Sequence, residues 1–475
     1  MSKDKKGGIK RRDFLKIIGV ATGTAAVASS CSPPVEQIIP YVIPPEGIIP
    51  GVPNYYASTC RECPAGCGII VKNREGRAIK IEGNPESPIN SGSSCAMGQA
   101  ALQGLYNPDR VKSPLSNINA EKLQPLGWAE AEKALTEKIE ELRGTGKTGN
   151  IVFLSNNITG SLGNLVDQWM GALGGKHVQY ETYAHEPLKE ANKISFGIEK
   201  IPTYHIEKTD YLLSFGADFI ETWLSPVEYT KQFSQMHGVK DKSVGRFVHI
   251  EPRASLTASN ADEWISVKPG TEAILALGIA NEIVKIGNSP NGGGGLRGLL
   301  SQYPADKVSE MTDVSQEAIS QIAKEFSSRK PSLAIGGGVS VTGTNATETL
   351  VAINILNYVA GNIGETVDFG DTLSISTADS FQDITSLVSS MENGDIDILF
   401  VYDVNPVFTL PKQLNFKEAV EKVPFVVSFS SFMDETTELA NLILPNNTPI
   451  ESWGDYSPRE SVHALIQPVM TPVFN

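Results

Sequence analysis

Four of the five cysteines in this 475-residue chain have the spacing expected of ligands to one metal centre. They follow the pattern C-x2-C-x3-C-x27-C, at Cys60, Cys63, Cys67 and Cys95. A cubane iron–sulfur cluster needs four thiolates that converge on one point. Three cysteines from a tight loop and one from a distant turn meet that need, and Pro64, Gly66 and Gly68 let the loop fold back on itself. The pattern therefore predicts one [4Fe–4S] cluster.

Two other interpretations of the cysteines stay open at this point. Zinc loops usually bring their cysteines as two close pairs, whereas this chain has three cysteines together and one apart. Exported cysteines often form disulfides, yet Cys60 and Cys63 are too close in sequence for an easy structural bridge. A zinc site, disulfides and free thiols are thus the alternatives to a cluster.

The residues between the third and fourth cysteines indicate how Cys95 returns to the loop. The stretches "GIIVKN" and "RAIKIEG" alternate apolar and polar residues and meet at Glu75 and Gly76, which predicts a β-hairpin. The following stretch "GNPESPINSGSSC" is rich in turn formers, so we expect it to carry Cys95 on a loop.

The first 31 residues have the layout of an export signal. A basic stretch contains Arg11 and Arg12, then "FLK", and a mildly apolar run from Ile17 to Ser30 follows. The arginine pair resembles a twin-arginine signal, whose route exports proteins already folded around a cofactor. Cys31 after "VASS" resembles a lipoprotein cleavage site, with an incidental cysteine as the alternative. We therefore expect the protein in the bacterial periplasm or on the outer face of the cytoplasmic membrane.

The rest of the chain has the composition of a multidomain globular protein. Residues 32–53 are rich in proline and are expected to form an extended tether. Forty basic against 54 acidic residues give a net charge of −14, which argues against a nucleic-acid-binding surface. No later apolar run reaches 18 residues, so no membrane span is predicted.

Buried strands alternate with amphipathic helices along the chain, which predicts parallel sheets covered on both faces. Strands are expected within residues 150–157, 209–218, 245–252, 331–340, 395–406 and 423–432. Helices are expected over 128–144, ending at Gly144, and over 271–287, capped by Thr271. Such sheets bind ligands beyond the carboxyl ends of their strands. Gly216, Pro252 and Asn405 lie at such ends, and each is either a ligand contact or a plain turn residue.

The block from Cys60 to Arg110 closely resembles the N-terminal iron–sulfur domain of the molybdopterin oxidoreductase superfamily, which includes formate dehydrogenases and polysulfide reductases. Three later segments resemble the same superfamily in the same order, at residues 249–284, 399–411 and 433–456. The resemblance implies an α/β fold, with a small β-rich 4Fe-4S domain over 54–112 and Rossmann-like parallel-sheet domains over 113–475. It also implies a molybdenum or tungsten ion held on two pterins.

This chain departs from the superfamily pattern in three places. The loop that usually supplies a Cys, selenocysteine or Ser to the metal aligns with residues 180–197, where Ser195 falls inside an expected helix. His185 and Glu186 are the remaining donors there, and such a pair is more typical of a structural hydrogen bond. Many catalytic members carry Lys or Arg two residues after the last cluster cysteine, whereas this chain has Met97. We also expect the C-terminal domain that closes over the second pterin to be missing or incomplete.

These departures most resemble the molybdopterin-oxidoreductase-like subunit of alternative complex III and related quinone reductase complexes. The resemblance implies three partners: a ferredoxin-like multi-cluster subunit, a polytopic quinone-binding membrane subunit and c-type cytochromes. We therefore expect an iron–sulfur electron-transfer or scaffold subunit of a quinol-oxidising complex, without molybdenum. An active molybdenum or tungsten bis-pterin oxidoreductase, and a structural exported protein with a zinc or empty cysteine site, are the alternatives.

Overall fold

The computed structural model describes residues 48–118, 122–183, 185–238 and 244–474. The expected export signal, Cys31 and most of the expected tether lie outside these residues. Contacts group residues 50–475 into one unit. Within the described ranges, no helix combines the length and the apolar character needed to cross a bilayer.

The first sheet carries the cysteine loop. Its strands β1 (Asn54–Thr59), β2 (Gly68–Arg74) and β3 (Arg77–Gly83) are antiparallel and lie in the order β1-β2-β3. The predicted hairpin is confirmed, because β2 and β3 pair through a turn in which Glu75 and Gly76 both have positive φ. Helix α2 (Ala96–Leu105) contacts β3, and its Leu105 is buried with Val71 and Ile81.

A seven-stranded sheet combines strands from both ends of the chain. Its order is β5 (Gln124–Pro125), β4 (Leu115–Ser116), β16 (Leu442–Ile443), β15 (Phe425–Ser428), β14 (Ile398–Tyr402), β6 (Ile151–Ser155) and β7 (Lys176–Gln179). The five strands from β16 to β7 are parallel, whereas β4 and β5 are antiparallel additions.

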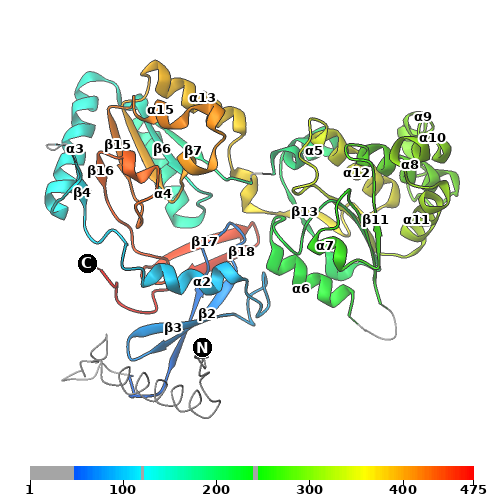
Figure 1. Cartoon of the computed structure of the whole chain (residues 1–475), viewed down its shortest axis with the longest axis horizontal. Coiled ribbons are helices and arrows are strands. Elements are labelled where there is room, and N and C mark those ends of the chain that lie inside the picture. Colours follow the sequence, from blue (N-terminus) through cyan, green and yellow to red (C-terminus); the bar gives the residue numbers. More distant parts are fainter. Residues whose placement is uncertain (1–47, 119–121, 184, 239–243, 475) are drawn as a thin grey trace, which may run out of the picture. The chain divides into compact units, whose positions relative to one another are not determined.

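Helices cover both faces of this sheet (Figure 1). They are α3 (Trp128–Thr145), α4 (Gly160–Leu173), α13 (Phe381–Asn393) and α15 (Phe416–Val420). Successive residues of β6 point to opposite faces, so Phe153 is buried with residues of α3 and α4, and Leu154 with residues of α13 and α15. The predicted α/β class, with parallel sheets covered on both faces, is confirmed.

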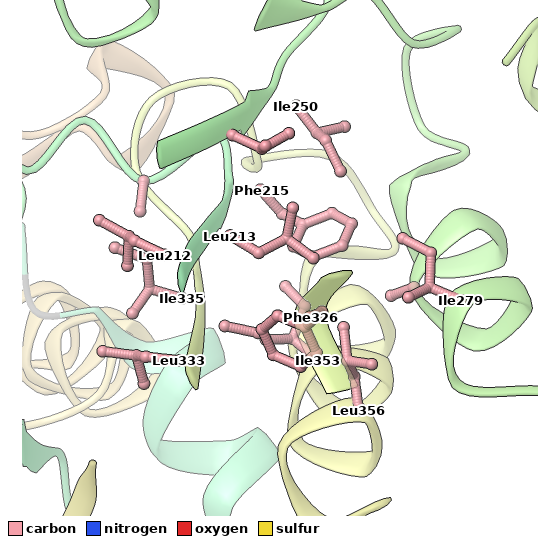
Figure 2. Close-up of a cluster of buried hydrophobic side chains, with 14 of the residues drawn as sticks. Leu212, Leu213, Phe215, Ile250, Ile279, Phe326, Leu333, Ile335, Ile353 and Leu356 are labelled. Carbon is pink, nitrogen blue, oxygen red and sulfur yellow. The ribbon is translucent and has the colours of Figure 1, made fainter. Parts of the chain in front are cut away.

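A second parallel sheet has the order β11 (Glu263–Ile265), β10 (Arg246–Ile250), β9 (Tyr211–Phe215) and β12 (Ser332–Gly336). Figure 2 shows Leu213 beside Phe326 and Ile353 of the covering helices, whereas Leu212, Leu333 and Ile335 form a second group on the other face of the sheet. Those helices include α8 (Glu272–Lys285), α11 (Gln316–Ser328) and α12 (Ala346–Ala360).

The remaining elements connect these layers. The helices are α5 (Glu186–Phe196), α6 (Pro226–Met236), α7 (Leu256–Ser259), α9 (Arg297–Leu300), α10 (Ala305–Thr312) and α14 (Pro406–Thr409). The 3-10 turns are η1 (Thr148–Asn150), η2 (Ile206–Lys208), η3 (Gly294–Leu296), η4 (Ser374–Thr377), η5 (Lys412–Leu414) and η6 (Thr437–Leu439). Two antiparallel pairs complete the structure: β8 (Pro202–Tyr204) with β13 (Val367–Thr372), and β17 (Gly454–Arg459) with β18 (Val462–Ile466).

Two helix-end predictions differ from the structure. Helix α3 runs past Gly144 to Thr145, because it is Gly146 that adopts the left-handed φ of 71° needed to end it. Thr271 does stand at the start of α8, but its hydroxyl donates to the Lys268 carbonyl at 2.7 Å and does not cap the helix.

Candidate iron–sulfur centre and the neighbouring sheet edge

The loop between β1 and β2 folds back on itself and carries three of the four cysteines. The Cys60 N–H donates to the Cys67 carbonyl at 2.8 Å, which closes the loop. Gly66 has a φ of 60°, and a Cβ there would stand 2.7 Å from a ring carbon of Tyr456. Only glycine fits this turn without strain.

Cys95 stands at the start of helix α2 and faces the same loop. It is the N-cap residue, and the Gly98 N–H points to its sulfur at 3.5 Å. A Cβ on Gly98 would lie 3.6 Å from the sulfur of Cys60, so the first turn of α2 lies against the first cysteine. The structure thus brings together all four cysteines that the spacing singled out.

An asparagine fastens the segment before Cys95 to the loop. The Asn90 side chain accepts from the Gly68 N–H at 2.9 Å and donates to the Gly68 carbonyl at 2.8 Å. The same amide donates to the Ser93 carbonyl at 2.6 Å. Asn90 is fully buried, so these bonds fix the distance between the loop and the turn that leads to Cys95.

Three of the four thiols, those of the loop, lie in a poorly hydrated environment. All four are free, and Cys60 and Cys63 pack against the buried Cys67. Burial raises the pKa of Cys60 to about 12 and also raises the pKa of Cys63 and of Cys67, and the neighbouring cysteines add to each shift. The thiolates of these three cysteines are therefore stable here only beside a strong positive centre, and an iron–sulfur cluster supplies one.

Arg61, between the first two cysteines, links the loop to the large sheet. Its guanidinium stacks on the Tyr456 ring at 3.6 Å and donates to the Asn157 carbonyl at 2.9 Å. The Tyr456 hydroxyl in turn donates to the Pro64 carbonyl of the loop at 2.9 Å. Sequence reasoning missed this role of Arg61, although a charged residue between two candidate ligands was a usable signal.

Three acidic side chains lie near Arg61, beside the C-terminal ends of strands β6, β7 and β14. Burial raises the pKa of Glu62, Glu181 and Asp403. Asp403 accepts from the Asn156 side chain at 2.8 Å, and Glu181 accepts from the Asn157 N–H at 2.7 Å. The Arg61 charge acts against this rise for Glu181 and Asp403, so it is a cation that these two carboxyls share.

Among the described residues, no three His, Cys, Asp or Glu side chains are arranged to hold a single metal ion. A four-iron cluster occupies more space than one ion, so its ligands need not stand at single-ion distances. The convergence of the thiols and their burial fit a cluster.

Two family models match this chain. The model of the molybdopterin oxidoreductase Fe4S4 domain matches residues 54–107, and the model of the molybdopterin oxidoreductase matches residues 110–475. The chain belongs to the molybdopterin oxidoreductase family.

Relatives in this family include the molybdopterin-binding-like subunit of menaquinone reductase from Nitratidesulfovibrio vulgaris, which is 28% identical over 98% of this chain and 70% of its own length. The molybdopterin-containing subunit ArrA of arsenate respiratory reductase from Shewanella is 23% identical over 96% of this chain and 62% of its own length. The structure of acetylene hydratase from Pelobacter acetylenicus has the same fold, with a TM-score of 0.72 over 88% of this chain and 66% of that chain, at 18% identity.

The segment 180–197, which the sequence predicts to correspond to the family's ligand loop, uses its polar side chains in contacts within the fold. Glu186 accepts from the Phe381 N–H at 3.0 Å, and Ser195 lies inside α5 as predicted, where it accepts from the Asn354 side chain at 3.2 Å. His185 begins α5 with a φ of 49°, and burial lowers its pKa to about 4. Met97 is 54% exposed.

The family implies an iron–sulfur cluster and a pterin cofactor, and the described residues fit the cluster better than the pterin. The four thiols fit a cluster. A pterin diphosphate is anionic, and at the edge described above it would face Glu62, Glu181 and Asp403 with Arg61 as the cation among them. The residues at this edge therefore fit an anionic pterin poorly.

Two of the three predicted strand-end residues, Gly216 and Asn405, have contacts within the fold. Gly216 follows β9 with a φ of 67°, and a Cβ there would stand 2.2 Å from the Ser340 hydroxyl. Asn405 follows β14, where its side chain donates to Glu435 at 2.6 Å and accepts from the Thr436 hydroxyl at 2.7 Å. Both sets of contacts are those of turn residues.

Proposed function

We propose that this chain is the iron–sulfur electron-transfer or scaffold subunit of an exported, membrane-associated respiratory complex that oxidises quinol, and that it carries no molybdenum. The observation that carries the proposal is the convergence of Cys60, Cys63, Cys67 and Cys95 in a chain whose ligand-loop segment has no cysteine. The relative named as a menaquinone reductase subunit supports a role in a quinone-linked complex.

A bound [4Fe–4S] cluster supplies one-electron transfer. The chain's own residues bring the four thiols together, and the ring of Tyr456 and the backbone of Asn157 hold the Arg61 cation beside the loop. We propose that the domains divide as 54–112 for the cluster and 113–475 for the α/β part, and that the latter mainly contacts partners. Those partners are the ferredoxin-like, quinone-binding and c-type cytochrome subunits, at the outer face of the membrane.

An active molybdenum or tungsten oxidoreductase is the second candidate. The specific observation in its favour is the match to the arsenate reductase subunit named as molybdopterin-containing, which extends over 96% of this chain. A zinc or empty cysteine site in a structural protein is the third.

Metal and sulfide analysis of the purified protein tests the cluster. We expect about four iron and four sulfide per chain, broad visible absorption and a paramagnetic signal on reduction. Changing Cys63 to Ala removes one of the four thiolates and is expected to abolish that absorption and signal.

The matched control is Val462→Ala, because Val462 packs against the same loop without offering a sulfur ligand. This control is expected to keep the cluster. Zinc in place of iron, or a wild-type protein without iron, would show that the proposal is wrong.

A further inference from the structure

A small cavity separates the cysteine loop from a buried ion pair. Pro64 and Ala65 of the loop line one side of it, and Ser225, Glu228 and Arg459 are among the residues on the other side. Its volume is about 20 Å³, room for one water centre. The ion pair and the loop therefore face each other across a gap with room for about one water molecule.

The ion pair joins helix α6 to strand β17. Nη2 of Arg459 contacts Oε1 of Glu228, and their side chains are 9% and 4% exposed. Arg459 Nη1 also lies 3.7 Å from a carboxylate oxygen of Asp371. The Nε–H of Arg459 is buried and has no hydrogen-bond partner in the part of the chain that the structure describes, and a water in the cavity would provide one.

The pair lies within electrostatic reach of a candidate cluster ligand. Val227, next to Glu228, and Val462 pack in the same apolar cluster as Cys67 and Ala65. Pro64 and Ala65, which lie between Cys63 and Cys67, line the same cavity as Glu228 and Arg459. Because little water separates these groups, salt and solvent screen their interaction only weakly.

Stability does not account for such a pair. Two charges taken out of water lose as much solvation as they regain by attraction, so a buried ion pair contributes little net stability. The reduction potential of an iron–sulfur cluster, by contrast, depends directly on the charge and hydrogen bonds around it.

We propose that the Glu228–Arg459 pair sets the reduction potential of the cluster held by the Cys60–Cys67 loop and Cys95. The inference rests on the proposed function in one respect, that a cluster is bound. Reduction adds one electron, and so one negative charge, to the cluster, and the balance of charge across the cavity fixes how favourable that step is. Both side chains are positioning residues, because they act through the cluster and do not touch substrate.

The test is a redox titration of the cluster, followed by its paramagnetic signal, in the purified full-length chain. Glu228→Gln removes one negative charge but keeps the size of the side chain, so the Arg459 cation stabilises the reduced cluster and the midpoint potential is expected to rise. The double variant Glu228→Gln with Arg459→Gln removes the cation too, and its potential is expected to return toward the wild-type value.

An ion pair of the second parallel sheet provides the control. Arg246 on β10 and Glu325 on α11 lie 3.0 Å apart with side chains 30% and 25% exposed. Their other partners, Tyr211 and Glu263, also belong to that sheet, whereas the cysteine loop belongs to the first sheet. Glu325→Gln is therefore expected to leave the cluster potential unchanged.

An unchanged or lower potential in Glu228→Gln, with the cluster signal intact, would overturn the inference. If that variant loses its cluster, Arg459→Gln at pH 9 decides the question, because Glu228 is then left charged and unpaired and the potential must fall. A wild-type chain without a cluster contradicts the proposed function. If the wild-type chain binds a cluster and the midpoint potential is the same in these variants, only this inference is contradicted.

Discussion

His185 links the chemistry of a single side chain to the stability of the fold. Burial lowers its pKa from 6.5 to about 4 in the folded chain. Between these two values the unfolded chain binds more protons than the folded one, so the stability contributed by neutral His185 is present above pH 6.5 and is lost as the pH falls toward 4.

His185→Asn is expected to flatten this pH dependence. Asparagine does not titrate, and it tolerates the left-handed backbone found at this residue, with its φ of 49°. The thermal midpoint of the variant should fall less than that of wild type between pH 7 and pH 4.5. The exposed His463, changed to Asn, is the control that should follow wild type. Parallel profiles for wild type and His185→Asn would contradict this account.

At the same scale, the sequence predicted the candidate ligands, which the structure brings together, but not their neighbours. The four cysteines were predictable because residue type and spacing are local properties of the chain. The stacking of Arg61 on Tyr456, and the ion pair of Glu228 with Arg459, join residues far apart in sequence. No local pattern marks such pairs, because only the folded chain brings them together.

Among the elements, the cysteine loop depends on one glycine. An alanine at residue 66 would need a φ of 60° and would place its Cβ 2.7 Å from the Tyr456 ring. Gly66→Ala is therefore expected to destabilise the fold by about 1–3 kcal/mol. It should also speed the loss of visible absorption when a chelator removes iron, because the loop can no longer close around the cluster.

Gly144→Ala is the matched control for this prediction. Gly144 lies in helix α3, where an added Cβ meets nothing within 4 Å, so the change should stabilise by about 0.5–1 kcal/mol. It should leave the rate of cluster loss unchanged. Equal behaviour of the two variants would mean that the loop tolerates a side chain at residue 66.

Strands and helices with strong local patterns were predictable, but the order of the large sheet was not. The hairpin of β2 and β3 follows from alternation and a glycine turn, and α3 follows from its apolar face. In the large sheet, β6 from the first half of the chain lies between β7 and β14, and β14 comes from the second half. Periodicity identifies buried strands but carries no information about which of them become neighbours.

For the whole molecule, we predict that the chain performs no molybdenum chemistry. The segment predicted to correspond to the family's ligand loop has no cysteine, and Glu186 and Ser195 already form hydrogen bonds with Phe381 and Asn354. The neighbouring sheet edge would set Glu62, Glu181 and Asp403 against an anionic pterin. A buried charged group without matching partners is strongly disfavoured.

The purified protein should therefore contain molybdenum and tungsten far below one atom per chain, while its iron remains. With an artificial electron donor it should reduce no nitrate, sulfoxide or polysulfide, and it should not oxidise formate. In the proposed complex, added quinol should still reduce the cluster, because the proposed electron transfer needs the cysteines and the partner subunits but no pterin. Molybdenum or tungsten near one atom per chain, together with turnover of any of these substrates, would establish the active oxidoreductase instead.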